Sequence, residues 1–564
     1  MAATSDNPFL RISFSAVSEP ALTIMIAIYS GLVLNLPVFW RKFHVLDELV
    51  FSLLVSDVFS AVLVAVVVIH GFSLLGVRVY KGFAVFYLLM SAIAAYYMWQ
   101  FNVVIGYGIV QAVFGTEFNL SLESVGPALL VFVFFFGMVP AWLVFRAKVK
   151  CYKNSLQALF YRLGILVLVF VGLKCISYSY ERVRHQLVGG REQTNPIGVA
   201  AHSYIPSNWI SASIMAVGNY LINESLREKW RDPAKAFTLN ATEDLQGVYL
   251  VFVIGESARY NNFGLLGYQR NTTPLLEKQK NVLGFKASSC NTVTKASLAC
   301  MFVRSGGVRY DQETSQQYVY EMNVFQVLKE LGFTIDLFAM QSEAGFYTTV
   351  AADMFKIREE IGAEASHYGN PVIDDMLLVN QALASITEHP QGKHVVILHQ
   401  KGSHFLYSSR YPRAFSHFQP ECESMHCSKQ ALINAYDNSI LYTDYFLSSL
   451  IDRLKGKKVL LIYASDHGES IEEDQHFHGS PKFMAPAEQS QIPVIVWASD
   501  ALLQDPAAQQ HFAAIQQRHD AAEKLRHDQL FESILGCLGY QSPDGGIRAE
   551  NNWCAEEKQR LVTH

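Results

Sequence analysis

Val459–Glu469 reads VLLIYASDHGE, in which an apolar run ends in an aspartate and a histidine placed side by side. Open α/β sheets bind their ligands at the carboxyl ends of the strands. Carboxylate oxygens and imidazole nitrogens are both good ligands for Zn²⁺. The stretch therefore predicts a buried strand that presents Asp466 and His467 as a metal-binding pair.

Two further strand-like runs lead into polar residues. Val248–Ile254 is followed by Glu256, and Val395–Leu398 is followed by His404. One polar strand end is common, whereas three that can meet at the same sheet edge indicate a shared site. The predicted metal ligands are Glu256, Asp466 and His467, with His404 and His478 left for a second ion or for substrate.

From Tyr249 onward, strand-like runs alternate with helical stretches such as Ser315–Leu331 and Ser428–Leu454. This alternation predicts an α/β domain with a mainly parallel sheet sandwiched by helices. We assign residues 238–564 to this domain.

The first third of the chain is too apolar for a soluble enzyme. The 564 residues are 51% hydrophobic, and the mean hydropathy is +0.16. Crossing a bilayer takes about 20 apolar residues. We therefore expect a transmembrane domain of five helices over residues 1–180, with spans at 20–40, 49–72, 82–105, 126–145 and 156–180. No cleavage site follows the first span, which favours a retained anchor over a signal peptide.

The basic residues of the short loops predict the orientation. Residues 146–153 hold four Lys or Arg, whereas residues 114–125 hold none. We expect the N-terminus in the cytoplasm and the chain after about residue 180 outside. Arg41 and Lys42 are an exception, because this orientation places their short basic loop outside. Residues 181–237 then form a connector. Its apolar stretch up to Leu221 predicts either an amphipathic helix on the outer leaflet or a core helix of the soluble domain.

Cysteine spacing indicates an oxidising compartment. Six of the 8 cysteines follow the membrane part at short spacings, which predicts disulfides in an exported domain. The expected pairs are Cys290–Cys300, Cys422–Cys427 and Cys537–Cys554, with Cys151 and Cys175 left free. Zinc-binding thiolates are disfavoured because the chain lacks C-x-x-C pairs.

The segment Cys290–Cys300, CNTVTKASLAC, is rich in hydroxyls and is the best place for a nucleophile. If it leads into a helix, the backbone N–H groups of the helix N-terminus favour a phosphate. Composition leaves Thr292, Thr294 and Ser297 open. Ser257 adjoins Glu256, but neighbours on one chain rarely converge on the same point.

Two motifs resemble a known family. Gly255–Arg259 (GESAR) and Gly267–Pro274 (GYQRNTTP) resemble the G-E-T-A-R and G-Y-x-R-x-T-x-P signatures of lipopolysaccharide phosphoethanolamine transferases. These enzymes belong to the alkaline phosphatase/sulfatase superfamily. The C-x₃-T-x₅-C segment, the DHGES motif and the later His478 match in the same order, and the resemblance extends over essentially the whole chain, membrane part included.

The resemblance implies a fold and a site. The fold is an N-terminal five-helix membrane domain followed by a sulfatase-like α/β domain. The implied ligands of a catalytic Zn²⁺ are Glu256, Thr294, Asp466 and His467, with other divalent cations and a second ion left open. Thr294 is then the nucleophile that carries phosphoethanolamine. His404, His478 and Glu469 would hold the second metal or the substrate.

One departure from the family concerns the acceptor. Lipid A-modifying members carry an N-N-S-x-x-K-G-like segment, and Met340–Gly345 (MQSEAG) stands in its place. Gln341 replaces the substrate-side Asn, and the Lys has no counterpart. We expect acceptor-side roles for Gln341, Glu343 and Thr116, and a place in the branch that modifies the Kdo sugar of the inner core.

The implied reaction moves phosphoethanolamine from phosphatidylethanolamine to lipopolysaccharide and releases diacylglycerol. We expect a monomer without a nucleic-acid partner, in contact with membrane lipids. It would be a multi-pass protein of the Gram-negative inner membrane with its catalytic domain in the periplasm. The added ammonium would weaken the attraction of polymyxin-like cationic peptides to the surface.

Other functions share parts of this pattern. Transfer to a lipid A phosphate remains open, as does phosphoglycerol transfer of the lipoteichoic-acid-synthase kind, whose single-metal site would not need His404 and His478. A sulfatase needs a C-x-P-x-R segment, and Cys300–Arg304 lacks the proline. A membrane receptor would not explain the convergent ligand residues.

Overall fold

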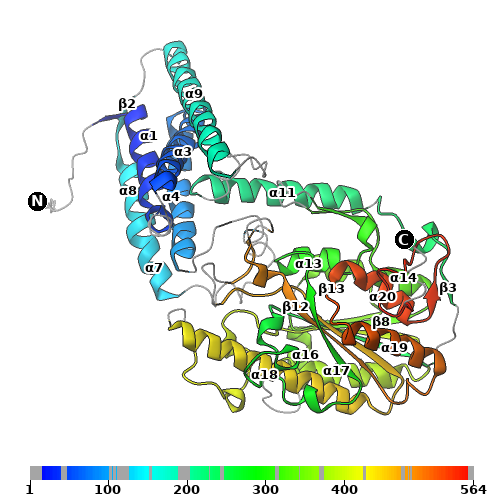
Figure 1. Cartoon of the computed structure of the whole chain (residues 1–564). Helices are drawn as coiled ribbons and strands as arrows, with labels where there is room; N and C mark the ends of the chain where they lie inside the picture. Colours follow the sequence, from blue (N-terminus) through cyan, green and yellow to red (C-terminus); the bar gives the residue numbers. More distant parts are fainter. Residues whose placement is uncertain are drawn as a thin grey trace, which may run out of the picture. The chain divides into compact units, whose positions relative to one another are not determined.

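The protein forms two compact units, which are described separately (Figure 1). Met1–Gly106 and Leu122–Ile214 make the N-terminal unit, and Tyr107–Ser121 and Met215–His564 make the C-terminal unit. The computed structural model describes residues 16–39, 48–100, 105, 110, 126–150, 155–188, 204–227, 229–241, 247–310, 317–341, 343–366, 374–423, 427–471, 477–480, 482 and 485–556.

The N-terminal unit is built from apolar helices. They are α1 (Glu19–Ile28) with a π-helical turn at Tyr29–Val33, α3 (Glu48–Ser73), α4 (Val77–Gln100), α7 (Pro127–Val133) joined to α8 (Val139–Arg146) by a π-helical turn at Phe134–Met138, and α9 (Ser155–Val188). A short parallel pair joins β1 (Val17–Ser18) to β2 (Val149–Lys150). Within the described residues, four helical stretches are long and apolar enough to cross a membrane: Val55–Ser73, Val77–Gln100, Pro127–Arg146 and Leu156–Ile176.

The first predicted span differs from the prediction. Its apolar helix covers Glu19–Val33 and is shorter than the other four. The helix is interrupted at Leu34 and Asn35, and Pro37, which has no N–H to donate, follows at once. Asn35 uses its side-chain amide to bind the carbonyls of Gly31 (3.0 Å) and Ile205 (2.8 Å). The second to fifth predicted spans are therefore confirmed, and the first is not.

The surface of the N-terminal unit suits contact with lipid. Leu168 is 75% exposed and Phe160 is 68% exposed, and apolar side chains on this scale indicate a membrane rather than water. One charge pair lies among these helices, with Glu19 buried and Arg162 half-buried. Arg162 donates to both carboxylate oxygens of Glu19, at 2.9 and 2.6 Å, so each charge is neutralised where neither is solvated.

The C-terminal unit contains an eight-stranded sheet. Its strands, in spatial order, are β13 (Leu525–Arg526), β5 (Val282–Ser288), β12 (Gln491–Ala498), β11 (Val459–Ser465), β4 (Tyr249–Gly255), β10 (His394–His399), β8 (Thr334–Ala339) and β9 (Met354–Ile357). Strand β12 runs antiparallel to β11 and β5, and all the other pairings are parallel. The prediction of a mainly parallel sheet is confirmed, and β12 is the one antiparallel strand in it.

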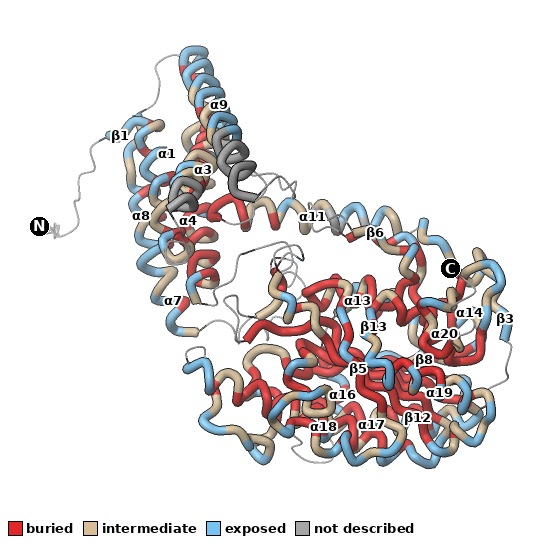
Figure 2. Tube along the Cα trace, in the orientation of Figure 1, coloured by how far each residue is buried: buried red, intermediate tan, exposed pale blue. Residues whose placement is uncertain are grey.

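Helices cover both faces of this sheet. Alternate residues of β4 point to opposite faces: Leu250 and Phe252 join one core cluster, and Val251 and Val253 join the other. The first face is covered by α13 (Thr294–Met301), α14 (Val324–Glu330) and α20 (Leu530–Cys537), and the second by α17 (Met376–Glu388) and α18 (Lys429–Leu454). Burial on both faces, drawn in red in Figure 2, explains why the strands are apolar throughout.

Smaller elements complete the C-terminal unit. They are α12 (Pro233–Ala236), α15 (Ala344–Val350), α16 (Arg358–Ser366), α19 (Pro506–Asp520), the pair β3 (Asn240–Ala241) with β14 (Tyr540–Gln541), and the pair β6 (Val308–Tyr310) with β7 (Gln317–Val319). Helix α11 (Ser207–Arg227) lies in the predicted connector, and the boundary between the two units falls inside it.

One predicted helix is partly wrong. Ser315–Leu331 contains strand β7, and its helix begins only at Val324. Asn323 starts that helix with a capping box, in which its side chain accepts the backbone N–H of Gln326 and the Gln326 side chain accepts the backbone N–H of Asn323. The helix predicted at Ser428–Leu454 is confirmed as α18, capped by Ser428.

Candidate active site

The predicted site residues lie where parallel strands end. Glu256 follows β4, Asp466 follows β11, His404 lies in the loop after β10, Gln341 lies just after β8, and Thr294 lies in the segment after β5. The carboxyl ends of these strands meet at one edge of the sheet. Segments far apart in the sequence therefore contribute to one buried cluster.

Three of the predicted metal ligands form that cluster. The side chains of Glu256, Asp466 and His467 are all buried, and their ligand atoms lie within 4.8 Å of one another. His467 Nε2 is 3.3 Å from Asp466 Oδ2 and 3.5 Å from Glu256 Oε1. His467 Nδ1 lies 2.8 Å from the Gly468 carbonyl, so it donates its proton there and directs the lone pair of Nε2 at the two carboxylates.

Charge and hydrogen bonding fit a divalent cation at this point. Among the described residues, Asp466 Oδ2 is buried without a hydrogen-bond partner, and neither carboxylate pairs with a Lys or Arg. Burial, together with the Glu256 carboxylate, raises the pKa of Asp466 well above its usual value. Burial also lowers the pKa of His467 to about 3, which keeps the imidazole in its neutral, ligand form. A bound cation would offset the charge of two buried carboxylates.

Thr294 is the hydroxyl that faces the cluster. It is the first residue of α13, and its Oγ1 lies 3.2 Å from Glu256 Oε2 and 3.2 Å from His467 Nε2. The other two candidates are turned away: Thr292 donates to the Ser480 carbonyl, and Ser297 donates to the Asn291 carbonyl. The predicted helix N-terminus is therefore confirmed, and geometry selects one hydroxyl of the three.

Ser257 has a supporting place. Its hydroxyl donates to Glu256 Oε1 (2.7 Å), and its backbone N–H donates to Asp466 Oδ1 (3.1 Å). Its φ of 55° lies in the left-handed region, which a non-glycine residue adopts only when the surrounding contacts require it. Ser257 thus orients two predicted metal ligands.

The remaining predicted histidines lie beside the cluster. The rings of His478 and His467 are 4.2 Å apart, and those of His404 and His478 are 6.3 Å apart. Glu469 is buried, and its Oε2 is 3.2 Å from His478 Nδ1. Burial opposes a charge on His478, but the Glu469 and Glu256 carboxylates outweigh it and raise the pKa of that imidazole.

The residues predicted on the acceptor side have different positions. Gln341 donates to Glu256 Oε2 (2.7 Å) and to the Gln400 carbonyl (2.9 Å), so it orients a predicted metal ligand. Glu343 is half-buried and immediately precedes α15. Thr116 lies outside the described residues.

A buried pair behind Gln341 was not predicted. The Tyr347 hydroxyl lies 2.7 Å from His399 Nδ1, and His399 Nε2 lies 3.4 Å from Gln341 Nε2. The available signal was His399 itself, a histidine that ends an otherwise apolar strand. Tyr347 has no comparable signal, because it lies in the unrelated helix α15.

All three predicted disulfides are confirmed: Cys290–Cys300, Cys422–Cys427 and Cys537–Cys554. The first brackets Thr294 and closes the turn that leads into α13. Cys175 is a free thiol, as predicted, and Cys151 lies outside the described residues.

Two family models match the chain. The model described as Sulfatase matches residues 249–540, which contain the whole cluster. The model described as Phosphoethanolamine transferase EptA/EptB matches residues 61–219.

Individual proteins resemble the chain over nearly its full length. The Kdo(2)-lipid A phosphoethanolamine 7''-transferase of Escherichia coli K12 is 41% identical over 555 residues, which cover 96% of this chain and 97% of that protein. Phosphatidylethanolamine transferase Mcr-1 of Escherichia coli is 28% identical over 524 residues, or 86% of this chain and 90% of that protein. The fold is shared with the membrane protein lipooligosaccharide phosphoethanolamine transferase A of Neisseria meningitidis, with a TM-score of 0.80, 23% identity, and coverage of 97% and 99%. The chain therefore belongs to the phosphoethanolamine transferases, enzymes that combine an N-terminal membrane domain with a C-terminal sulfatase-like domain.

Proposed function

We propose that this protein transfers phosphoethanolamine from phosphatidylethanolamine to the Kdo sugar of lipopolysaccharide, through a phosphorylated Thr294. The observation that carries the proposal is the position of Thr294 Oγ1, 3.2 Å from both Glu256 Oε2 and His467 Nε2. A nucleophilic hydroxyl beside buried carboxylate and imidazole ligands is the arrangement that metal-assisted phosphoryl transfer requires.

Glu256, Asp466 and His467 would hold the cation together with Thr294 Oγ1. Two carboxylates and one imidazole favour Zn²⁺, and we propose one such ion here, with His404 and His478 as the residues that would hold a second ion or the substrate. When bound, the ion lowers the pKa of a coordinated hydroxyl and offsets charge on the phosphate oxygens. Gln341 and Ser257 keep the Glu256 carboxylate in place by donating one hydrogen bond to each of its oxygens.

The first step forms a bond between Thr294 Oγ and phosphorus and breaks the bond from phosphorus to diacylglycerol. The Thr294 hydroxyl donates toward Glu256 Oε2, which is placed to take its proton. Since Glu469 raises the pKa of His478, that imidazole is placed to protonate the departing diacylglycerol oxygen. In the second step an acceptor hydroxyl attacks the phosphorus and gives its proton to the now neutral His478, while the bond from phosphorus to Thr294 Oγ breaks and the Thr294 oxygen takes back its proton from Glu256.

The acceptor assignment rests on relatedness. The Kdo(2)-lipid A enzyme is 41% identical to this chain, whereas phosphoethanolamine transferase EptA of Escherichia coli K12 is 26% identical over 469 residues. Mild acid hydrolysis separates Kdo from lipid A. We expect mass spectrometry of both parts, after reaction with purified protein, to find the new group on Kdo. Finding it on a lipid A phosphate would contradict the acceptor and leave the transferase chemistry standing.

We also propose the location. The basic loop at residues 146–153 favours the cytoplasm for the chain just before the last span, Leu156–Ile176, and therefore the opposite side of the membrane for the chain after it. Disulfides favour an oxidising compartment. An inner-membrane protein with its catalytic domain in the periplasm has both features. We propose that it works there as a monomer, with α11 as the helix that lies along the outer leaflet.

A further inference from the structure

A second cluster of acid and histidine side chains lies in the same sheet, away from the active site. Asp336 is in β8, His394 is the first residue of β10, and His389 directly follows α17. The active-site residues follow the carboxyl ends of the parallel strands, whereas His394 lies at the opposite end of β10. With a rise of about 3.3 Å per residue, the six residues of β10 keep the two clusters roughly 17 Å apart.

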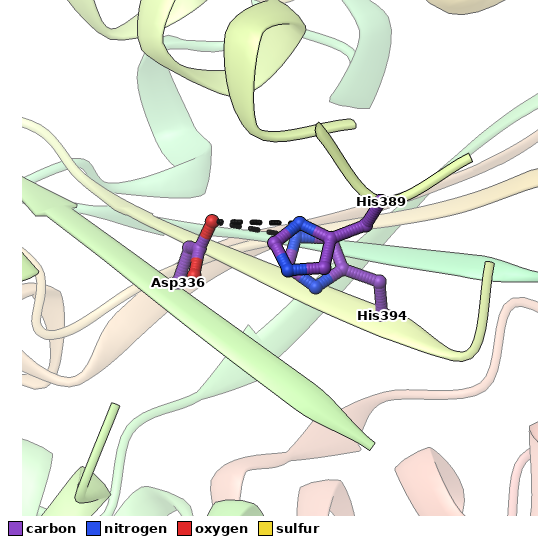
Figure 3. Close-up of side chains that lie close together, drawn as sticks. All are labelled: Asp336, His389 and His394. Carbon is purple, nitrogen blue, oxygen red and sulfur yellow. Dashed lines mark ion pairs between the residues drawn. The ribbon is translucent and has the colours of Figure 1, made fainter. Parts of the chain in front are cut away.

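The two imidazoles point at the same carboxylate oxygen (Figure 3). Asp336 Oδ2 lies 3.6 Å from His394 Nε2 and 4.0 Å from His389 Nδ1. Both distances are longer than a hydrogen bond between nitrogen and oxygen, about 2.7–3.2 Å. Ligands about 2.0–2.1 Å from a tetrahedral Zn²⁺ are about 3.3 Å from one another. The gap is therefore too wide for direct hydrogen bonds and needs little contraction to hold a metal.

The Asp336 carboxylate is incompletely satisfied. It is buried, and its Oδ1 has no hydrogen-bond partner among the described residues. Its Oδ2 accepts one hydrogen bond, from the Ser385 hydroxyl at 2.7 Å. The ion-pair partners that the described residues offer are His389 and His394, with no Lys or Arg. A buried carboxylate without a basic partner is costly unless it keeps a proton or a cation binds to it.

Further contacts hold the histidines in position. The Thr334 hydroxyl lies 2.7 Å from His394 Nδ1, an outer contact of the kind that orients a metal-binding imidazole and directs its other nitrogen, Nε2, toward the cluster. The rings of His389 and His394 stack, with centroids 3.9 Å apart and planes at 11°. The Ser385 hydroxyl also lies 2.7 Å from His394 Nε2, and His389 Nδ1 lies 3.0 Å from the Ser385 carbonyl. A metal bound here would replace these two contacts.

The cluster is accessible from water. The His389 side chain is 27% exposed, whereas those of Asp336 and His394 are almost fully buried. An ion can thus enter past His389, and a water molecule can complete the coordination from that side. Two imidazoles and one carboxylate favour a transition metal over Mg²⁺ or Ca²⁺.

We propose that Asp336, His389 and His394 bind a Zn²⁺-class divalent cation at a structural site separate from the catalytic one. The ion links β8, β10 and the loop after α17, and it stabilises this edge of the domain without taking part in the reaction. Binding releases any proton that the two imidazoles carry, because only the neutral ring is a ligand.

Metal counting on the full chain tests this proposal. The detergent-purified protein, without an affinity tag, is stripped with a chelator, reloaded with Zn²⁺ and analysed for metal per chain. We expect His389→Gln and Asp336→Asn each to hold one Zn²⁺ fewer than the unmodified protein. His519→Gln, which changes an exposed histidine of the same domain, should lose none. The Zn²⁺-dependent rise in thermal unfolding temperature should shrink in the first two variants only.

A Co²⁺ titration provides a second reading, because each occupied site adds its own visible absorption. In an Asp466→Asn background the catalytic site is weakened, and the remaining absorption should disappear when His389→Gln is added. Equal metal content in the unmodified protein and His389→Gln would overturn the proposal, and the cluster would then be a hydrogen-bonded polar core. His389 is partly exposed, so this variant is informative even if Asp336→Asn fails to fold.

Discussion

The two acid–histidine clusters lie in one sheet and contain the same kinds of side chain, yet only one has a nucleophile. Glu256, Asp466 and His467 lie beside Thr294 at the first turn of α13. Asp336 and its two histidines have the hydroxyls of Ser385 and Thr334 beside them, but neither lies at a helix N-terminus: Ser385 is inside α17, and Thr334 is the first residue of β8.

The difference follows from which end of the strands each cluster occupies. At the carboxyl ends of parallel strands, loops and helix N-termini converge, and backbone N–H groups are available to an anion. At the other end, the chain enters the strands from helix ends such as that of α17. Ligand chemistry alone therefore does not identify an active site, since a reactive group and an anion-binding surface must lie at the same place.

Removing the nucleophile should have the largest effect. Thr294→Ala should lower turnover of a fluorescent phosphatidylethanolamine by more than about 10³-fold, since the covalent step has no substitute. Thr294→Ser should keep part of the activity, because it retains the hydroxyl. Thr292→Ala serves as the control, because this neighbouring hydroxyl is turned away from the cluster and donates to the Ser480 carbonyl. Unchanged turnover in Thr294→Ala would remove Thr294 as the nucleophile.

Matched changes at the two clusters should separate catalysis from structure. Asp466→Asn should lower both bound Zn²⁺ and turnover, the latter by more than about 100-fold, since a neutral amide is a poor ligand for a divalent cation. Asp336→Asn should leave turnover within about twofold of normal. Both are measured by metal analysis and a transfer assay on the same preparation. A comparable loss of turnover in the two variants would end the distinction between the clusters.

The residues that support the ligands should give intermediate effects. Gln341→Ala removes one of three side-chain hydrogen bonds to Glu256 and should cost about 10–100-fold in turnover. Ser385→Ala, at the hydroxyl beside Asp336, should spare turnover and should not weaken Zn²⁺ binding at the second cluster, because a bound metal replaces the Ser385 contact with His394. If Gln341→Ala changes the acceptor used and leaves the rate unaltered, the acceptor-side role predicted from the sequence is correct and the orienting role is wrong.

Asp444 is a buried carboxylate with no histidine beside it, so it serves as a comparison for the two acid–histidine clusters. Replacing it should have the smallest effect, a change in how stability depends on pH. Asp444 accepts the backbone N–H groups of Leu275 and Leu276, and burial raises its pKa to about 7 from an unfolded value of 3.8. Between these two values the folded chain keeps a proton that the unfolded chain has released. The free energy of unfolding therefore falls as pH rises through this window.

In Asp444→Asn the free energy of unfolding should decrease less as pH rises. Denaturant unfolding at several pH values measures this. Asp500→Asn, at a carboxylate near the surface, is the control. An unchanged pH slope in Asp444→Asn would mean that this carboxylate is ionised in the folded protein.

The sequence predicted that Glu256, Asp466 and His467 lie together because each follows an apolar run typical of a buried strand. It left Thr292, Thr294 and Ser297 equivalent, because the choice depends on which hydroxyl turns toward the cluster, and only the family resemblance favoured Thr294. It missed the first span's interruption near Asn35, which depends on a contact with distant Ile205.

The second cluster was also missed. Asp336 lies within an apolar strand, and it meets the two histidines only through the parallel pairing of β8 with β10. The spacing of residues along the sequence does not indicate that β8 and β10 are neighbours. The contacts of Gln341 likewise depend on the strands that flank it, so the sequence assigned it to the acceptor.

Trapping the covalent intermediate tests the central claim most directly. The full chain is incubated with phosphatidylethanolamine in the absence of acceptor, and its intact mass is measured before the modified peptide is mapped. We expect a gain of one phosphoethanolamine group, located on Thr294 within the peptide that contains Cys290–Cys300, and no gain in Thr294→Ala. A modified residue elsewhere, or the same gain in Thr294→Ala, would contradict the account.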